Sequence, residues 1–240
     1  MNVWRYALPR FLMFDTSNLI GISIDEEDRQ PTGSTYTLQD PDGSKVIDAA
    51  AADNAVGGAT FKVKATHLEN ESEGMAYLET WVLTFSATDV RTFRREVIVC
   101  VAEPHQVITD ADLEAVARTL GAELPTGEDW SEQRGEAWNH LLAWLINKGW
   151  NPAAIRNLAA LRLAHCYWAL ELIAAELDTL TAGPGKWGKR LREFKEYRRK
   201  ELSELQLHVD TDGDGMPDSN RAARPQVYLS NRPNWTPGAY

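Results

Sequence analysis

The chain contains little cysteine: two residues in 240, Cys100 and Cys166. No Cys-x-x-Cys pair and no Cys/His spacing of the kind found in zinc sites is present in the sequence. The two cysteines are far apart and each stands among apolar residues. We therefore expect both to be buried free thiols, the usual state of such residues. A disulfide between them is the alternative.

Long apolar runs are also missing. The first residues, MNVWRYALPRFLMF, are interrupted by Arg5, Pro9 and Arg10, which leaves no apolar segment of the secretory kind. No stretch reaches about 18 uncharged apolar residues, so we expect no membrane span and no membrane partner. The sequence favours a protein that stays in the cytoplasm that made it, or that assembles into a larger structure there.

Positive charge is in deficit, with 25 basic residues against 35 acidic ones and a formal net charge of −10. The chain as a whole is therefore not expected to coat nucleic acid or an anionic membrane, although a local basic patch could still do so. The remaining composition, 43% hydrophobic and 25% charged, is ordinary for a folded protein. A chain of this length can bury a sizeable core in one large domain or two smaller ones.

Four common catalytic motifs are absent: the sequence holds no GxSxG, P-loop, GxGxxG or HExxH. None of its five histidines pairs with another at metal-binding spacing. His165 and Cys166 are adjacent, which invites comparison with a Cys–His nucleophile pair. Neighbouring residues of a helix point about 100° apart, so we interpret both as core residues. We expect no catalytic residues and no enzymatic activity.

The front half, from about residue 20 to 103, is rich in strand patterns. STYTLQD and SKVIDA flank the turn Pro41–Gly43, which is typical of a hairpin. ATFKVKATHL alternates apolar and polar residues, and the runs AYLETWVLTF and RTFRREVIVCV are separated only by SATD. LIGISI near the start brings the number of strands to about six. We predict an N-terminal antiparallel β-sandwich of immunoglobulin-like type over residues 1–104.

Beyond about residue 105 the periodicity becomes helical. Thr109 can cap a first helix, with Asp112 three residues later as in a capping box. SEQRGEAWNHLLAWLINKG predicts a second helix, and a third, the most buried, is expected to open at Asn151-Pro152 and run through AAIRNLAALRLAHCYWALELIAAEL. The last helix is KRLREFKEYRRKELSELQL. The predicted fold class is α+β: the sandwich, an α-helical bundle over residues 105–207, and an Asp-rich loop with an extended C-terminal tail over residues 208–240.

The stretch HVDTDGDGMPDSNR, residues 208–221, matches the first nine positions of a calcium-binding loop of EF-hand or thrombospondin type. The candidate Ca²⁺ ligands are Asp210, Asp212, Asp214, Met216 through its carbonyl, and Asp218. Gly215 permits the sharp reversal that turns the carboxylates inward. Position 12 should be a bidentate acid but is Arg221, and no exiting helix is expected, so a complete EF-hand is not predicted. A polar turn that needs no ion is the alternative.

The last predicted helix is strongly basic, because residues 186–200 hold eight lysines or arginines and two glutamates. Its candidate basic surface consists of Lys189, Arg190, Arg192, Lys195, Arg198 and Arg199. One interpretation is a surface that faces an acidic partner or DNA. A solvated amphipathic helix whose charges balance an acidic chain is the alternative. The pattern lacks the interleaved aromatic residues of sequence-specific nucleic-acid readout.

The order of these elements resembles the head–tail connector (adaptor) proteins of tailed bacteriophages. A helical bundle with the alanine-rich LRLAHCYWALELIAAEL is followed by the charged helix EFKEYRRKELSELQL, the acidic DTDGDGMPD and the extended ARPQVYLSNRP. The resemblance covers roughly residues 105–235 and is one of order and composition. The front half, with YTLQDPDG and YLETWVLTF, looks like the immunoglobulin-like modules of phage structural proteins. Decoration and contact with the capsid vertex are both open as its role.

The resemblance implies a structural virion protein of the neck, forming a homo-oligomeric ring, twelve-fold by analogy, beneath the portal protein. Further implied partners are other connector or tail-completion proteins, with passive contact to DNA in the channel. The tail from Arg224 onward would reach the neighbouring portal ring. Its candidate contact residues are Arg224, Gln226, Val227, Tyr228, Leu229, Arg232 and Trp235. The tail has too little apolar content to fold alone, and QVYLS could add to a partner's sheet edge.

A second class of protein remains open from the same residues. A β-sandwich with an Asp-rich loop also fits a secreted calcium-dependent adhesion or carbohydrate-binding protein. That class would be favoured by a secretion signal and by paired cysteines, and we expect neither in this chain.

Overall fold

The computed structural model describes residues 8–14, 16–24, 29–119, 129–180, 186–210 and 218–222. The fold is mixed α+β. The chain divides into two compact units. The β unit consists of Met1–Pro104 with Leu145–Ala153, and the helical unit consists of His105–Trp144 with Ala154–Tyr240.

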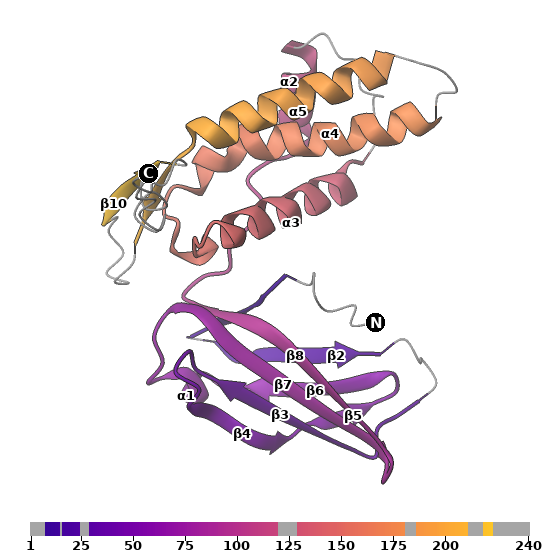
Figure 1. Cartoon of the computed structure of the whole chain (residues 1–240), viewed down its shortest axis with the longest axis vertical. Helices are drawn as coiled ribbons and strands as arrows, with labels where there is room; N and C mark the ends of the chain where they lie inside the picture. The colour runs from indigo at the N-terminus through magenta and orange to yellow at the C-terminus, as the bar shows by residue number, and fades with distance from the viewer. Residues whose placement is uncertain are drawn as a thin grey trace, which may run out of the picture. The chain divides into compact units, whose positions relative to one another are not determined.

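The larger sheet of the β unit has five strands in the order β1-β8-β7-β3-β4 (Figure 1). These strands are β1 (Arg10–Met13), β3 (Gly33–Gln39), β4 (Lys45–Ala51), β7 (Gly74–Ser86) and β8 (Asp89–Cys100). All neighbours are antiparallel except β1 and β8, which pair in parallel with Arg10 opposite Val97. The prediction of a purely antiparallel sheet is therefore wrong at this edge. Alternation along a strand specifies its faces but not the direction of its partner.

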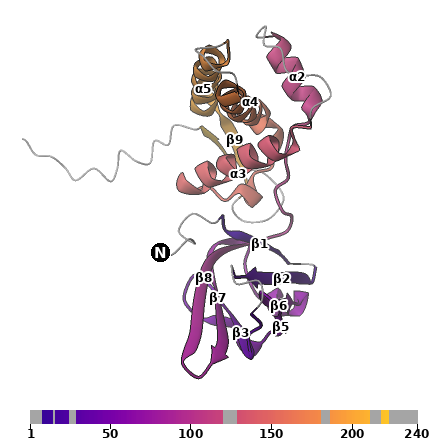
Figure 2. The ribbon, with the colours of Figure 1, turned by 90° about the vertical axis from the view of Figure 1, so that its right-hand side faces the viewer.

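A second sheet has three strands in the order β2-β6-β5 (Figure 2). Its strands are β2 (Asn18–Ser23), β5 (Asp53–Ala55) and β6 (Gly58–Val63), and the short helix α1 (Ala65–Leu68) follows β6. One hydrophobic cluster draws on both sheets, with Ile20 and Val63 from the smaller sheet and Leu12, Leu38 and Trp81 from the larger one. The two sheets therefore share one core.

Both predicted hairpins of the larger sheet are confirmed. β3 and β4 pair across the turn at residues 40–44, where Gly43 adopts a φ of +85° that a side chain would disfavour. β7 and β8 pair up to Ser86 and Asp89, as the short SATD segment predicts. The sequence did not predict β1 or β5, which are short. The alternating segment ATFKVKATHL was expected to be one strand, but β6 ends at Val63 and the last four residues form α1 (Ala65–Leu68).

The helical unit contains four longer helices and a two-stranded sheet among the described residues. These elements are α2 (Asp110–Thr119), α3 (Ser131–Asn147), α4 (Arg162–Leu180), α5 (Lys186–Glu204), β9 (Gln206–Val209) and β10 (Ser219–Ala222). The end of α3, from Leu145 onward, is assigned to the β unit. α2 begins where the sequence predicts, because the Asp112 carboxylate accepts a 2.7 Å hydrogen bond from the Thr109 backbone N–H.

α4 supplies much of the core of the helical unit. Its residues Leu170 and Ile173 are fully buried in one cluster with Leu113 of α2, Ala137 of α3 and Phe194 of α5. By length and composition alone, Leu158–Thr179 could cross a membrane, a criterion that core helices also meet. Cys166 of α4 and Cys100 of β8 are free and buried, as the sequence predicts.

The third helix starts ten residues later than predicted. Two 3₁₀ turns, Pro152–Ala154 and Leu158–Leu161, occupy the segment expected to be α-helical, and α4 begins only at Arg162. Between the turns, Ile155 forms a β-bridge with Val209 and the Arg156 N–H donates to the His208 carbonyl at 2.9 Å. Pairing with β9 therefore overrides the helical pattern of this segment.

Candidate functional site

The Asp-rich loop lies between two paired strands, β9 and β10, where Val209 stands opposite Ser219. β9 is anchored on its other side as well. The Asp210 N–H donates to the Ala154 carbonyl at 2.9 Å, and Leu207 and Val209 are buried. The chain therefore enters the loop from a strand that is held along both edges.

Asn157 clamps β9 with its side-chain amide. Its Nδ2 donates to the Gln206 carbonyl at 3.2 Å, and its Oδ1 accepts from the His208 N–H at 2.7 Å. A side chain that mimics a strand's pattern of donor and acceptor satisfies backbone groups that would otherwise be unpaired. The clamp fixes the position of β9 against the segment before α4.

Asp210, the first predicted calcium ligand, is engaged by an arginine. Its side chain is fully buried, and its Oδ2 accepts hydrogen bonds from both Nε (2.9 Å) and Nη2 of Arg156. A buried carboxylate is stable only when it is paired in this way. A cation at position 1 of the loop would have to share this carboxylate with a guanidinium, which weakens the case for Asp210 as a ligand.

Of the other predicted calcium ligands, the structure describes only Asp218. Asp218 is exposed, and its N–H donates to the Val209 carbonyl at 3.0 Å, which closes the loop at the start of β10. Asp212, Asp214 and Met216 lie outside the described residues. Within the part of the chain that the structure describes, no group of three acidic, histidine or cysteine side chains is arranged to hold a metal. Calcium binding by the loop stays a prediction.

Three of the six residues of the predicted basic surface form interactions within the helical unit. Arg190 pairs with Glu193 at 2.7 Å, and Lys189 lies 4.0 Å from the same carboxylate. Arg198 pairs with Glu171 of α4 at 2.7 Å and also stacks over the Trp168 ring, 4.1 Å from its centroid. Arg198 therefore joins α5 to α4, whereas Lys189 and Arg190 pair within α5 itself.

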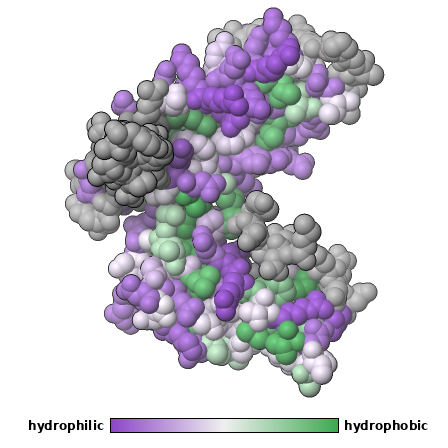
Figure 3. Space-filling model, viewed as in Figure 1, coloured by the Kyte–Doolittle hydropathy of each residue, from purple (hydrophilic) through white to green (hydrophobic). Residues whose placement is uncertain are grey.

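The other half forms an exposed stripe. Arg192, Lys195 and Arg199 are exposed and recur at the i, i+3 and i+7 spacing that places residues on one helix face. None of the three forms an ion pair with a described residue. The surface over α5 is accordingly hydrophilic (Figure 3). We call Arg192, Lys195 and Arg199 the basic stripe; it is the part of α5 that an acidic partner could contact.

His165 and Cys166 are core residues, as interpreted from the sequence. His165 Nε2 lies 2.9 Å from the Arg134 backbone carbonyl, and its ring packs against Trp138 with centroids 5.2 Å apart. Burial raises the pKa of the Cys166 thiol to about 12, so the thiolate needed for nucleophilic attack is not formed near neutral pH.

Acid is expected to destabilise the helical unit through His165. Burial lowers the pKa of His165 to about 4, and Nδ1 has no hydrogen-bond acceptor among the described residues. The stability that neutral His165 contributes is complete above the ordinary pKa of about 6.5 and is lost as the pH falls through about 4. Between about pH 7 and about pH 4.5 we expect a loss of about 2 kcal/mol from this group.

Urea unfolding of the wild type and of His165→Gln at both pH values measures this loss. Glutamine can keep the donor to the Arg134 carbonyl but does not titrate. The variant should therefore lose about 2 kcal/mol less on acidification than the wild type. Equal losses in both proteins would contradict the assignment, because Asp112 and Asp129, whose pKa values are lowered by hydrogen bonds, are present in both.

The predicted tail contacts, Arg224, Gln226, Val227, Tyr228, Leu229, Arg232 and Trp235, all lie outside the described residues. Arg156 and Asn157, which position the strand that leads to this tail, were missed by the sequence analysis. They lie 54 and 49 residues from the groups they bind. The only local signal was an asparagine and an arginine inside an otherwise apolar pattern.

No protein-family model matches the chain, and no curated protein is detectably similar to it in sequence. Function is therefore inferred from the residues and their geometry.

Proposed function

We propose that the chain is a head–tail connector (adaptor) protein of a tailed bacteriophage, a structural subunit that assembles as a ring beneath the portal. In this proposal the two sheets of the β unit are an immunoglobulin-like sandwich, and the helical unit carries the connecting function. The basis is the resemblance in the order of elements: a buried alanine-rich helix, a charged helix, an acidic turn and an extended tail.

The observation that best supports the proposal is the anchoring of β9 at the exit of the helical unit. Asn157 and Arg156 hold β9 and Asp210 by side-chain hydrogen bonds, and β10 pairs with β9 up to Ala222. A tail that begins after a strand fixed in this way has a defined point of departure. A segment that a partner orders gains affinity when the residues before it are already positioned.

The basic stripe suits the same role. None of Arg192, Lys195 and Arg199 forms an ion pair with a described residue. In an assembly they would face an acidic portal surface or the DNA that passes through the ring. Calcium in the Asp-rich loop would act as a staple that stiffens the turn before the tail, in addition to the Arg156–Asp210 pair.

Truncation after Ala222 tests the connector proposal. This variant keeps the β9–β10 pairing and every described core residue, so we expect its melting temperature to match that of the full chain. It should no longer assemble on the portal of the phage that encodes it, because the segment that a partner would order is gone. Negative-stain microscopy and gel filtration of the mixed proteins measure the assembly.

A variant with residues 223–240 in scrambled order is the matched control. It keeps the length and composition of the tail, so recovery of assembly by this variant would point to non-specific tethering. Rings on the portal that form as well without the tail as with it would refute the proposed mode of connection. Monomers that bind a carbohydrate would favour the adhesion class.

A further inference from the structure

Two surfaces of opposite charge lie on the helical unit. The first is the basic stripe of α5, whose three cations form no ion pair with a described residue. The second lies on α3 and α4 and consists of three exposed carboxylates, those of Glu132, Glu136 and Glu176. We call these three residues the acidic group. In the part of the chain that the structure describes, none of them pairs with a lysine or an arginine.

The acidic group is held together by α3. Glu132 and Glu136 are four residues apart and so lie on the same face of this helix. Glu176 of α4 joins them, because its Oε2 accepts a 2.7 Å hydrogen bond from Nε2 of Gln133, the residue after Glu132. His140 lies 3.5 Å from Glu136 but is a weaker counter-ion than a lysine or an arginine, since a neutral imidazole carries no charge. The group therefore keeps a net negative charge.

α4 runs between the helices that carry the two surfaces (Figure 1). Its Glu171 pairs with Arg198 of α5, whereas its Glu176 bonds to Gln133 of α3. These two residues of α4 are five positions apart, and at roughly 100° per residue their side chains point about 140° apart around the helix. α3 and α5 therefore flank α4 on well-separated sides, so the stripe and the acidic group of one copy do not meet.

We propose that the basic stripe of one copy binds the acidic group of the next copy, and that this contact is the subunit interface of the ring. The inference rests on the ring assembly of the proposed function and names the surfaces that meet in it. Two different patches that bind each other give a head-to-tail contact, which closes into a ring when the rotation between copies allows it. Every stripe then meets one acidic group, and three cations face three carboxylates.

A second copy suits the stripe better than DNA does. The chain carries a formal net charge of −10, so two copies repel each other unless opposite charges meet locally. The stripe and the acidic group provide this match from the chain's own residues and in equal number. DNA would neutralise the stripe but would leave the acidic group to repel the acidic copies on either side.

Zero-length cross-linking of the full chain tests the contact directly. A carbodiimide joins an amine to a carboxylate that touches it, and Lys195 supplies the amine of the stripe. Unlabelled and ¹⁵N-labelled chains are mixed, alone and with the portal of the phage that encodes them, and the cross-linked peptides are identified by mass spectrometry. We expect mixed-isotope peptides that join Lys195 to the acidic group. Lys195→Arg is the matched control, because it keeps the charge but removes the reactive amine.

Reversal of charge tests whether the contact holds the copies together. Lys195→Glu with Arg199→Glu should weaken association between copies about tenfold or more, because carboxylates then face carboxylates. Adding Glu132→Lys and Glu136→Lys should restore it, since the charges of the interface are then exchanged. Sedimentation velocity of the full chain measures association, and melting temperatures show whether each variant is folded. Where a variant fails to fold, the cross-link in the wild type decides.

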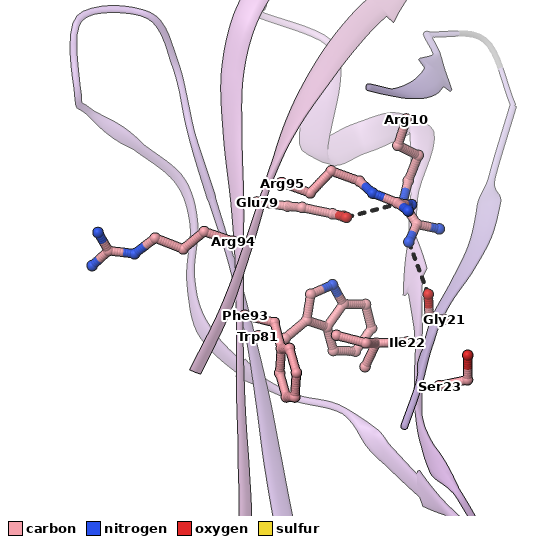
Figure 4. A pocket seen from close by; sticks show the side chains of 9 residues that line it. All are labelled: Arg10, Gly21, Ile22, Ser23, Glu79, Trp81, Phe93, Arg94 and Arg95. Carbon is pink, nitrogen blue, oxygen red and sulfur yellow. Dashed lines mark hydrogen bonds and ion pairs between the residues drawn. The ribbon is translucent and has the colours of Figure 1, made fainter. Parts of the chain in front are cut away.

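Reversal of two exposed cations elsewhere is the control for net charge. Lys62 of β6 and Arg94 of β8 are exposed, and Figure 4 shows the Arg94 side chain pointing away from buried Glu79. Lys62→Glu with Arg94→Glu changes the net charge as much as the stripe variant does but should alter association by no more than about twofold. The same pair combined with Glu132→Lys and Glu136→Lys returns the net charge to −10 and should still fail to restore association.

No mixed-isotope cross-link from Lys195 in either sample would overturn the inference, as would cross-links to the portal instead of to a second copy. A folded four-substitution variant that does not regain association would overturn it as well, because the stripe would then serve another partner such as DNA. Rings that assemble on the portal in spite of such a result would leave the connector proposal standing. Cross-links between copies that never bind the portal would support the interface and refute the connector.

Discussion

Replacing Phe194 with alanine should lower the free energy of unfolding of the helical unit by about 3 to 5 kcal/mol, the cost of removing a fully buried phenyl ring and leaving a cavity. Phe194 is 0% exposed and belongs to the cluster that joins α2, α3, α4 and α5. Leu170 and Ile173 of the same cluster lie on α4 and are themselves fully buried, so little solvent-facing side chain is available there to fill the cavity. The loss should therefore fall at the upper end for such a substitution.

Urea unfolding followed by far-UV circular dichroism measures this loss. Lys195→Ala is the matched control, because Lys195 is the next residue of α5 but is exposed and belongs to the basic stripe. Its effect on stability should stay within about 0.5 kcal/mol. If both variants cost the same, α5 would not be packed through the face that bears Phe194, and the assignment of its opposite face as a free basic stripe would fail with it.

Replacing Asp210 with alanine should destabilise the helical unit by about 3 to 4 kcal/mol, because it leaves the Arg156 guanidinium without its carboxylate. The Asp210 side chain is fully buried, whereas that of Arg156 is 31% exposed, so some solvent reaches the unpaired cation. The substitution also loosens the end of β9, where Asp210 follows directly. We expect the effect without any added metal.

A double-mutant cycle with Arg156→Ala and a repeat in the presence of a chelator separate the ion pair from calcium. Asp218→Ala is the control, since Asp218 is exposed in the same loop. If the pair dominates, the loss in Asp210→Ala is unchanged by the chelator and largely disappears in the Arg156→Ala background. If the chelator alone destabilises the wild type by the same amount, the staple is an ion and Asp210 is a ligand.

Much of the β unit could be predicted from local patterns. The hairpin at Gly43 and the one between Ser86 and Asp89 follow from turn residues between alternating runs. The start of α2 follows from Thr109 and Asp112, whose side chains interact as a capping box implies. These features depend on neighbours within a few residues, and such neighbours are visible in a sequence.

The parts that could not be predicted depend on distant partners. The segment from Pro152 to Leu161 has a helical pattern, yet Ile155 pairs with Val209 as a strand would. The conformation of this segment is decided by β9, because the backbone N–H and C=O groups of β9 need hydrogen-bond partners. No local pattern carries that requirement. For the same reason the parallel pairing of β1 with β8 was not foreseen.

The candidate sites were likewise predictable only where their residues are close together in the sequence. The Asp-rich loop is recognisable from spacing, but only the structure shows that Arg156 already neutralises Asp210. The buried pair of Glu79 with Arg10 leaves a weaker trace, a single acid on the inward and otherwise apolar or aromatic side of the alternating strand β7. A charged residue at a core position is a signal that could have been read, but its partner on β1 could not.

Each unit carries one buried cysteine: Cys100 at the end of β8 and Cys166 in α4. Burial raises the pKa of both thiols to about 12, so neither is modified by an alkylating reagent while its surroundings stay closed. The rate at which each becomes alkylated thus measures how often that half of the molecule opens. Mass spectrometry of the two cysteine peptides can follow both halves in one tube, with no introduced label.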